Sequence, residues 1–147
     1  MKRTISRLLV VGLVAGYATL AVAADDEEVI KYRKNVMKAY AAHMAAAGAI
    51  VQGKVEAKGQ LVHHANALAA TAQDMAGMFP AGSDFGETNA LDGVWSKRAD
   101  FEKRAKDTQI KAAAFAKAAG GGDAAGKFAE LSDSCKACHK DYRKAQK

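Results

Sequence analysis

The sequence predicts an all-α protein that folds as an antiparallel four-helix bundle. Half of the 147 residues are apolar but only 7% are aromatic. Much of the apolar half is alanine, the strongest helix former. The chain contains one proline, and the β-branched or aromatic runs that would indicate strands are scarce. Four stretches with helical periodicity, separated mostly by short glycine-bearing breaks, complete the pattern.

The first 23 residues are predicted to be a targeting segment. Three basic residues precede an apolar run over 8–20, and Ala21-Val22-Ala23 supplies the small-x-small pattern of a cleavage site. The run is shorter than the roughly 20 residues that a membrane span needs. We therefore expect a cleaved signal peptide over 1–23, rather than a retained anchor, and a mature domain over 24–147. Such a domain would reside in the periplasm without a stable membrane anchor.

Cleavage would remove three basic residues and lower the formal net charge from +6 to +3. The remaining lysines and arginines do not cluster with interleaved aromatic residues, so nothing indicates binding to nucleic acid. Most of these charges are interpreted as solvated helix faces.

The first two helices are predicted over 27–52 and 58–78. The first opens with acidic residues, which suit the positive end of the helix dipole, and it ends at Gly53. Its inward stripe has three- and four-residue spacing: Val29, Arg33, Met37, Tyr40, Met44, Ala47 and Val51. The second places Leu61, Leu68 and Met75 seven residues apart.

A loop is predicted over 79–90, which contains a proline and two glycines and has no periodicity. The third helix is expected over 91–119, and its heptad positions are Val94, Phe101, Thr108 and Phe115. Three glycines end it, and Asp123 is expected to cap the fourth helix, which runs close to the C-terminus. The inward positions of this last helix are Phe128, Leu131, Cys135, Cys138 and Tyr142.

The fourth helix carries the sequence Cys135-Lys136-Ala137-Cys138-His139, which is the Cys-x-x-Cys-His attachment motif of haem c. Both cysteines of the chain belong to it. The two thiols would add to the two porphyrin vinyl groups as thioethers, and the adjacent imidazole would bind the iron. We therefore predict one covalently attached haem c, held by Cys135 and Cys138, with His139 as an iron ligand.

Three other uses of the two cysteines fit less well. A thioredoxin-like redox pair requires a βαβ setting. A zinc site requires further ligands at a recognisable spacing, which His43, His63 and His64 do not supply. A disulfide between residues three apart on one helix is possible in an oxidising compartment but would constrain little.

With this motif at the end of four helices, the sequence resembles the cytochrome c′ superfamily, the class II c-type cytochromes. The resemblance covers essentially the whole mature chain, and only the Cys-x-x-Cys-His motif is specific by itself. Two further stretches support the resemblance together, by their order along the chain: Ile30-Lys31-Tyr32-Arg33 and Val94-Trp95-Ser96. In the fourth helix the likeness extends from Ser134 to Arg143.

The family divides by the residue that faces the iron opposite the histidine. That position lies four residues after the Arg of the Tyr-Arg pair, so the resemblance implies that Met37 is the sixth iron ligand, in the low-spin, methionine-ligated branch. The alternative is that Met37 only fills the core. Met44 lies about 10.5 Å further along the helix axis, so only one of the two can stand at the height of the iron. A bis-histidine haem is a further alternative.

The resemblance also assigns lighter roles to two arginines and two aromatic residues. Arg33 would pair with a haem propionate, and Arg143 would lie near the proximal histidine, although either could be an ordinary solvated charge. Trp95 and Tyr32 are expected to be packing residues.

The expected function is one-electron transfer in the periplasm between redox partner proteins, by a haem with histidine and methionine ligands. Methionine opposite histidine favours the ferrous state and raises the reduction potential. The alternative is a five-coordinate or displaceable-ligand haem that binds nitric oxide or carbon monoxide. An enzymatic activity is not expected, because no distal His–Arg pair for peroxide chemistry is apparent. A homodimer is possible.

Overall fold

The structure is a computed structural model that describes residues 26–145. It contains five helices: α1 Asp26–Val51, α2 Lys58–Thr71, α3 Gly93–Ser96, α4 Arg98–Ala118 and α5 Ala124–Tyr142. The signal peptide and cleavage site predicted over 1–23 lie outside the described residues. Within residues 26–145, no helix is both long and apolar enough to cross a membrane.

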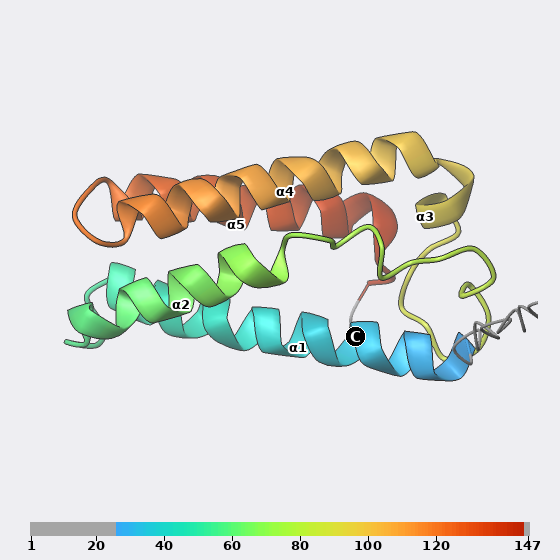
Figure 1. Ribbon diagram of the computed structural model, residues 1–147, viewed down its shortest axis with the longest axis horizontal. Coiled ribbons are helices and arrows are strands. Elements are labelled where there is room, and N and C mark those ends of the chain that lie inside the picture. Colours follow the sequence, from blue (N-terminus) through green and yellow to red (C-terminus); the bar gives the residue numbers. More distant parts are fainter. Residues whose placement is uncertain (1–25, 146–147) are drawn as a thin grey trace, which may run out of the picture.

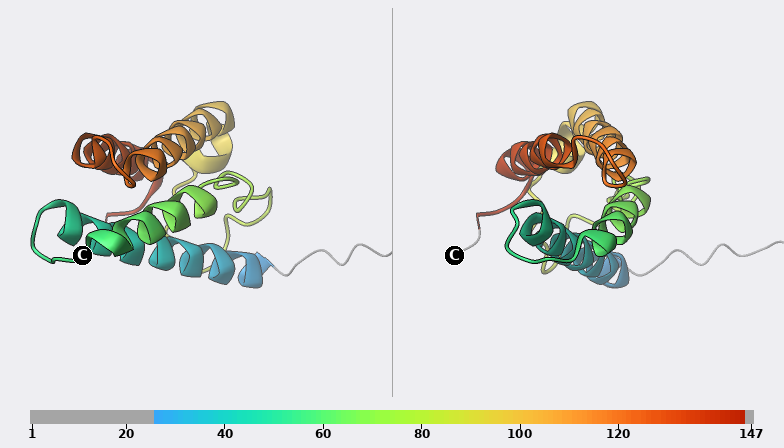
Figure 2. Two further views of the ribbon diagram at one scale, coloured as in Figure 1. Left: turned by 60° about the vertical axis from the view of Figure 1, so that its left-hand side comes forward. Right: turned by 90° about the vertical axis from the view of Figure 1, so that its left-hand side faces the viewer.

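The four long helices form an antiparallel bundle (Figure 1), as the sequence predicted. Helix α1 packs on α2, α2 on α4 and α4 on α5, and α5 returns beside α1 to close the ring. The view along the bundle shows the four helices around a common centre (Figure 2). The segment between α2 and α3 crosses one end of the bundle, beside the start of α1.

The heptad positions form the core. Val94, Phe101, Thr108 and Phe115 are all buried, as expected from their spacing. Phe115 meets Phe128 of α5 edge to face, with ring centres 5.4 Å apart. These contacts join α4 to α5 along their length, and burial of each large apolar side chain contributes on the order of 2 kcal/mol.

Helix α2 ends at Thr71, seven residues before the end predicted from the sequence. The chain continues through turns in which the Asp74 carboxylate accepts a hydrogen bond from the Gly77 backbone N–H at 3.2 Å. This local side-chain bond competes with helix continuation. Met75 and Met78 remain buried although they leave the helix, so the apolar pattern was correct and the helical interpretation of its last part was wrong.

The third predicted helix is divided at Lys97, whose φ of −117° and ψ of 43° are not helical. Side chains on both sides of the break are tied to the segment that precedes α3. Trp95 Nε1 donates to the Pro80 carbonyl at 2.9 Å, and the Arg98 guanidinium donates to the carbonyls of Phe79 and Ala76. These anchors fix α3 and α4 at an angle that one continuous helix does not provide.

The two aromatic residues expected to pack behave differently. Trp95 is half-buried and packs edge to face on Phe79, with ring centres 6.3 Å apart. Tyr32 is 61% exposed, so its assignment as a packing residue was wrong. It follows Lys31 on the solvent side of α1, next to the inward-facing Arg33.

The cap of α5 yields a stability prediction. The Asp123 carboxylate accepts the Gly126 backbone N–H at 2.8 Å, as expected for an N-cap. Asp123→Ala should lower the free energy of unfolding by about 1 kcal/mol, measured by denaturant titration. The matched control, Asp133→Ala, removes a carboxylate of α5 that pairs with the exposed Lys136, and it should cost under about 0.5 kcal/mol. Equal losses would contradict the capping role.

Candidate functional site

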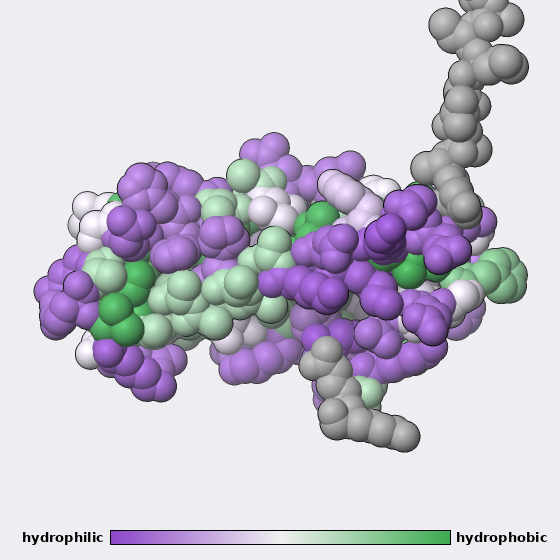
Figure 3. Space-filling view, turned by 90° about the horizontal axis from the view of Figure 1, so that it is seen from below, coloured by the Kyte–Doolittle hydropathy of each residue, from purple (hydrophilic) through white to green (hydrophobic). Residues whose placement is uncertain are grey.

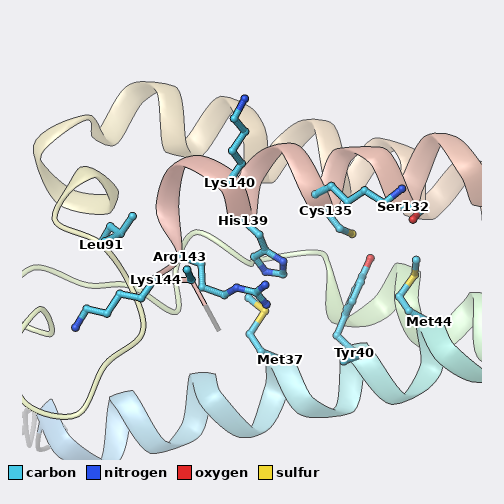
Figure 4. Close-up of a pocket in the computed structure, with 13 residues that line it drawn as sticks. Met37, Tyr40, Met44, Leu91, Ser132, Cys135, His139, Lys140, Arg143 and Lys144 are labelled. Atoms are coloured by element: carbon cyan, nitrogen blue, oxygen red, sulfur yellow. The ribbon is translucent and has the colours of Figure 1, made fainter. Parts of the chain in front are cut away.

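Two adjoining cavities open between α1 and α5, and Figure 4 shows the larger one. Their volumes are about 930 and 330 Å³, within the usual range of sites for small organic ligands and cofactors. The smaller one reaches further into the bundle core. Several residues line both cavities: Met37, Tyr40, Ala41, Cys135, His139 and Arg143.

The attachment motif forms the α5 wall of these cavities. Cys135, Cys138 and His139 are half-buried, and both cysteines are free thiols. Burial raises the pKa of both thiols, which keeps them protonated at neutral pH. Burial, and next the nearby Arg143 cation, lower the pKa of His139. The imidazole therefore stays neutral, the form that binds a metal.

The last turn of α5 is fixed to α4. The Tyr142 hydroxyl donates to the Asp100 carboxylate at 2.5 Å, and this bond raises the pKa of Tyr142 to about 12. Arg104 pairs with Asp100 at 3.0 Å and with Asp141 at 2.9 Å, and so bridges the two helices. The same Asp100 carboxylate therefore holds a residue of α4 and a residue of α5.

The chain that follows α5 is fixed to the segment before α3. The Leu91 backbone N–H donates to the Tyr142 carbonyl at 2.9 Å, and Lys144 N–H donates to the Asn89 carbonyl at 2.8 Å. An isolated antiparallel bridge joins Ala90 to Arg143. With the contacts to α4, these bonds hold the turn that carries His139 from two sides.

Helix α1 supplies the facing wall. Met37, Tyr40 and Met44 follow one another at helical spacing, and all three point from α1 toward α5 in Figure 4. The Met37 side chain lies opposite His139, whereas Met44 lies further along the helix, beyond Tyr40. Met75, from the turns after α2, lines the inner cavity together with Met37. Of the two methionines of α1 that line the larger cavity, the structure thus brings Met37, and not Met44, opposite His139.

Arg33 lies at the end of the inner cavity and is 3% exposed. Its guanidinium donates three hydrogen bonds of 2.7 Å, to Ser83 Oγ, the Ser83 carbonyl and Thr88 Oγ1. Its Cζ is 4.9 Å from the centre of the Phe79 ring. Desolvation lowers the pKa of Arg33, and the Asp84 carboxylate offsets part of this change. The sequence did not indicate these acceptors, and the propionate contact of Arg33 stays a prediction.

Two buried polar atoms of the cavity wall have no hydrogen-bond partner among residues 26–145: Tyr40 Oη and Arg143 Nε. Such atoms are costly unless a bound group satisfies them. The Tyr40 pKa is raised, chiefly by burial, so this hydroxyl keeps its proton. A cavity with two thiols, a neutral imidazole, apolar walls and an unsatisfied guanidinium N–H fits a haem with acidic propionates. The role of Tyr40 was missed, although its spacing from Met37 was a usable signal.

The other histidines lie elsewhere. His63 is exposed, and His43 and His64 are half-buried. Among the described residues, His139 is the only histidine that lines either cavity. The bis-histidine alternative therefore has no second imidazole at the site.

A four-helix bundle with a Cys-x-x-Cys-His motif facing an internal cavity defines a c-type haem protein. A family model described as Cytochrome C′ matches residues 28–143. The chain is 38% identical to cytochrome c′ of Pararhodospirillum photometricum over 124 residues, which is 82% of this chain and 99% of the relative. The chain therefore belongs to the cytochrome c′ family and, like its members, binds one covalent haem c.

Solved structures agree with this assignment. Cytochrome c prime from Shewanella frigidimarina superposes with a TM-score of 0.79 at 32% identity, over 84% of this chain and 99% of that one. A ferrous variant of cytochrome c prime from Alcaligenes xylosoxidans with bound NO gives 0.76 at 26% identity, with the same coverage. A cytochrome c′ with ligand-controlled dimer dissociation gives 0.76 at 25%, again over 84% and 99%. These similarities do not support the low-spin, methionine-ligated branch that the sequence suggested.

The site predicts how haem is retained. In acid–acetone, colour should stay with the protein in the wild type and in the single variants Cys135→Ser and Cys138→Ser, because one thioether is enough for covalent attachment. The double variant should release its haem into the organic phase, and absorption of the two phases measures this. Release from the wild type would show that these cysteines do not form the link.

Proposed function

We propose that this protein is a periplasmic haem c protein that binds nitric oxide or carbon monoxide, with Cys135 and Cys138 as the covalent attachment and His139 as the permanent iron ligand. The haem would supply a redox-active iron that can take up a small ligand. The observation that carries this proposal is the composition of the α1 wall. Met37 lies opposite His139 and has a sulfur atom suited to iron.

A thioether is a weak ligand that a diatomic ligand can replace. Met37 is half-buried and has an unbranched, flexible side chain, so it can swing away without disturbing the core. The nearby Ala41 and the protonated Tyr40 of the same cavity wall do not compete for the metal. The cavity wall thus combines a ligand that can be replaced with space into which its side chain can move. The gas complexes of the Alcaligenes relative are in keeping with this proposal.

Arg143 and Tyr40 would complete the site. The unpartnered Nε of Arg143 can donate to a carboxylate, and its charge adds to the effect of burial, which lowers the pKa of the adjacent His139. The Tyr40 hydroxyl has a proton to donate within the cavity. With no second histidine lining the described part of the cavities, we further propose that the protein binds its ligand without catalysing a reaction.

The Met37→Leu variant tests the displaceable ligand, because leucine keeps the volume but lacks the sulfur. The ferrous wild type should bind carbon monoxide with a shift of its absorption spectrum. Met37→Leu should bind carbon monoxide at least about tenfold more tightly. In this variant no sulfur competes for the iron, so a larger fraction of the protein is ready to bind the gas. Met44→Leu is the control and should behave as the wild type. A ferrous wild type that does not respond to carbon monoxide would contradict this proposal and favour the electron carrier.

One observation favours one-electron transfer as a second candidate function. Every charged residue that lines the two cavities is basic, and within residues 26–145 no Asp or Glu lines either one. The cations are Arg33, Lys34, Lys38, Lys136, Lys140, Arg143 and Lys144. We define the five lysines of this set as the basic rim. A basic rim at the edge of a redox cofactor steers an acidic partner protein toward the shortest path for an electron.

Charge reversal on the basic rim tests this candidate. Lys38→Glu with Lys140→Glu should slow oxidation of the ferrous protein by ferricyanide about tenfold at low salt. The effect should fade above about 0.15 M, where the Debye length is near 8 Å. The control is Lys103→Glu with Lys106→Glu, which makes the same change in net charge on exposed positions of α4. If the two pairs slow the reaction equally, total charge rather than the rim is responsible.

A homodimer stays a prediction. The outer face of α1 carries a pale green, mildly apolar band in Figure 3. Exposed alanines of α1 that line neither cavity include Ala39, Ala42 and Ala45. Small side chains of this kind allow helices of two subunits to approach closely, which supports pairing through this face.

A further inference from the structure

A pair of histidines lies where α1 packs against α2. His43 of α1 and His64 of α2 are half-buried, and their Nδ1 atoms are 3.0 Å apart. The ring centres are 5.3 Å apart and the ring planes are tilted by 53°. Neither residue lines the haem cavities, so the haem site gives this pair no role.

The contact between two Nδ1 atoms means that two lone-pair positions share one proton. One ring must be the Nδ1–H tautomer, and the other must accept through its own Nδ1. If the donating ring instead carries its proton on Nε2, two Nδ1 lone pairs from different helices face the same small volume. Both residues are partly exposed. Paired neutral imidazoles at this separation form a chelating site for divalent transition metals.

The distance between the two Nδ1 atoms discriminates among metals. With metal–nitrogen bonds of about 2.0–2.1 Å, nitrogens 3.0 Å apart subtend an angle of about 91–97° at the ion. This angle is close to the roughly 90° between neighbouring ligands in square-planar or octahedral coordination, and smaller than the roughly 109° of a tetrahedral zinc site. Cu²⁺ and Ni²⁺ adopt the first two geometries, and Cu²⁺ is bound most tightly by a given nitrogen site.

We propose that His43 and His64 form a two-histidine site for Cu²⁺, and more weakly for Ni²⁺, with water at the remaining positions. A small rotation of each ring about its Cβ–Cγ bond turns the lone pairs from each other toward a common ion, with the two nitrogens kept near their present separation of 3.0 Å. The bound ion ties α1 to α2. Because the unfolded chain does not hold the two rings together, the ion stabilises the folded state.

Calorimetric titration of the ferric holoprotein with Cu²⁺ tests the site. His43→Gln and His64→Gln should each weaken this binding at least about tenfold. Loss of a group that merely orients a metal ligand already lowers metal affinity by about that factor. His63→Gln is the matched control, because it removes an exposed imidazole next to His64 and should leave binding unchanged. Cu²⁺ held by the amino terminus contributes equally to all variants and cancels in the comparison.

Thermal unfolding with Ni²⁺ gives an independent readout, since Ni²⁺ should raise the Tm of the wild type and of His63→Gln but not of the other two variants. The proposal is overturned if all variants bind Cu²⁺ alike, if His63→Gln loses the binding, or if Zn²⁺ binds more tightly than Cu²⁺. The haem absorption spectrum of each variant shows that the bundle is intact, so the result does not depend on the function of the haem site.

Discussion

The fixation of the last turn of α5 is the constraint on which the site depends. This turn presents His139 to the cavity, and at a free helix end it would fray. Here the Asp100 carboxylate holds both Tyr142 and Arg104. The pKa of Asp100 is lowered, first by the hydrogen bond from Tyr142 and then by the bond from Arg104. A backbone bridge from the segment before α3 holds the opposite side. The histidine is therefore oriented before any metal is present, as a preorganised ligand requires.

The facing wall is shaped by a second constraint, the buried guanidinium of Arg33. A buried cation without partners is costly, and here three hydrogen bonds and the faces of Phe79 and Trp95 surround it. Because its acceptors lie in the irregular segment after α2, the arginine draws that segment over the end of the inner cavity. The segment is thus a structural wall of the site as well as a connection between helices.

The sequence predicted the features that depend on local pattern. The heptad of α4 and the capping Asp123 are visible in single stretches of chain, and both were confirmed. The break at Lys97 depends on bonds between distant residues, such as Arg98 to the carbonyl of Phe79, and the C-terminal end of α2 is followed by a turn that the Asp74 side chain stabilises. Periodicity continues through both places, so it could not reveal them.

The candidate site was predictable to a similar degree. The attachment motif is compact, and helical spacing placed Met37 on its inward stripe. The acceptors of Arg33 lie 50 and 55 residues away in a segment without periodicity. Nor could the sequence show that Tyr40 Oη lacks a partner, because that depends on the packing of α5 over α1. The basic rim was hidden because its lysines come from α1, from α5 and from the chain after α5, and look like ordinary solvated charges in each.

The exclusively basic lining of the cavities has a consequence for assembly of the holoprotein. Seven cations line the two cavities, and without a cofactor their mutual repulsion weakens the packing of α5 against α1. The two carboxylates of a porphyrin would offset that repulsion while its ring fills the apolar space. Loading of the cofactor would thereby stabilise the closed bundle.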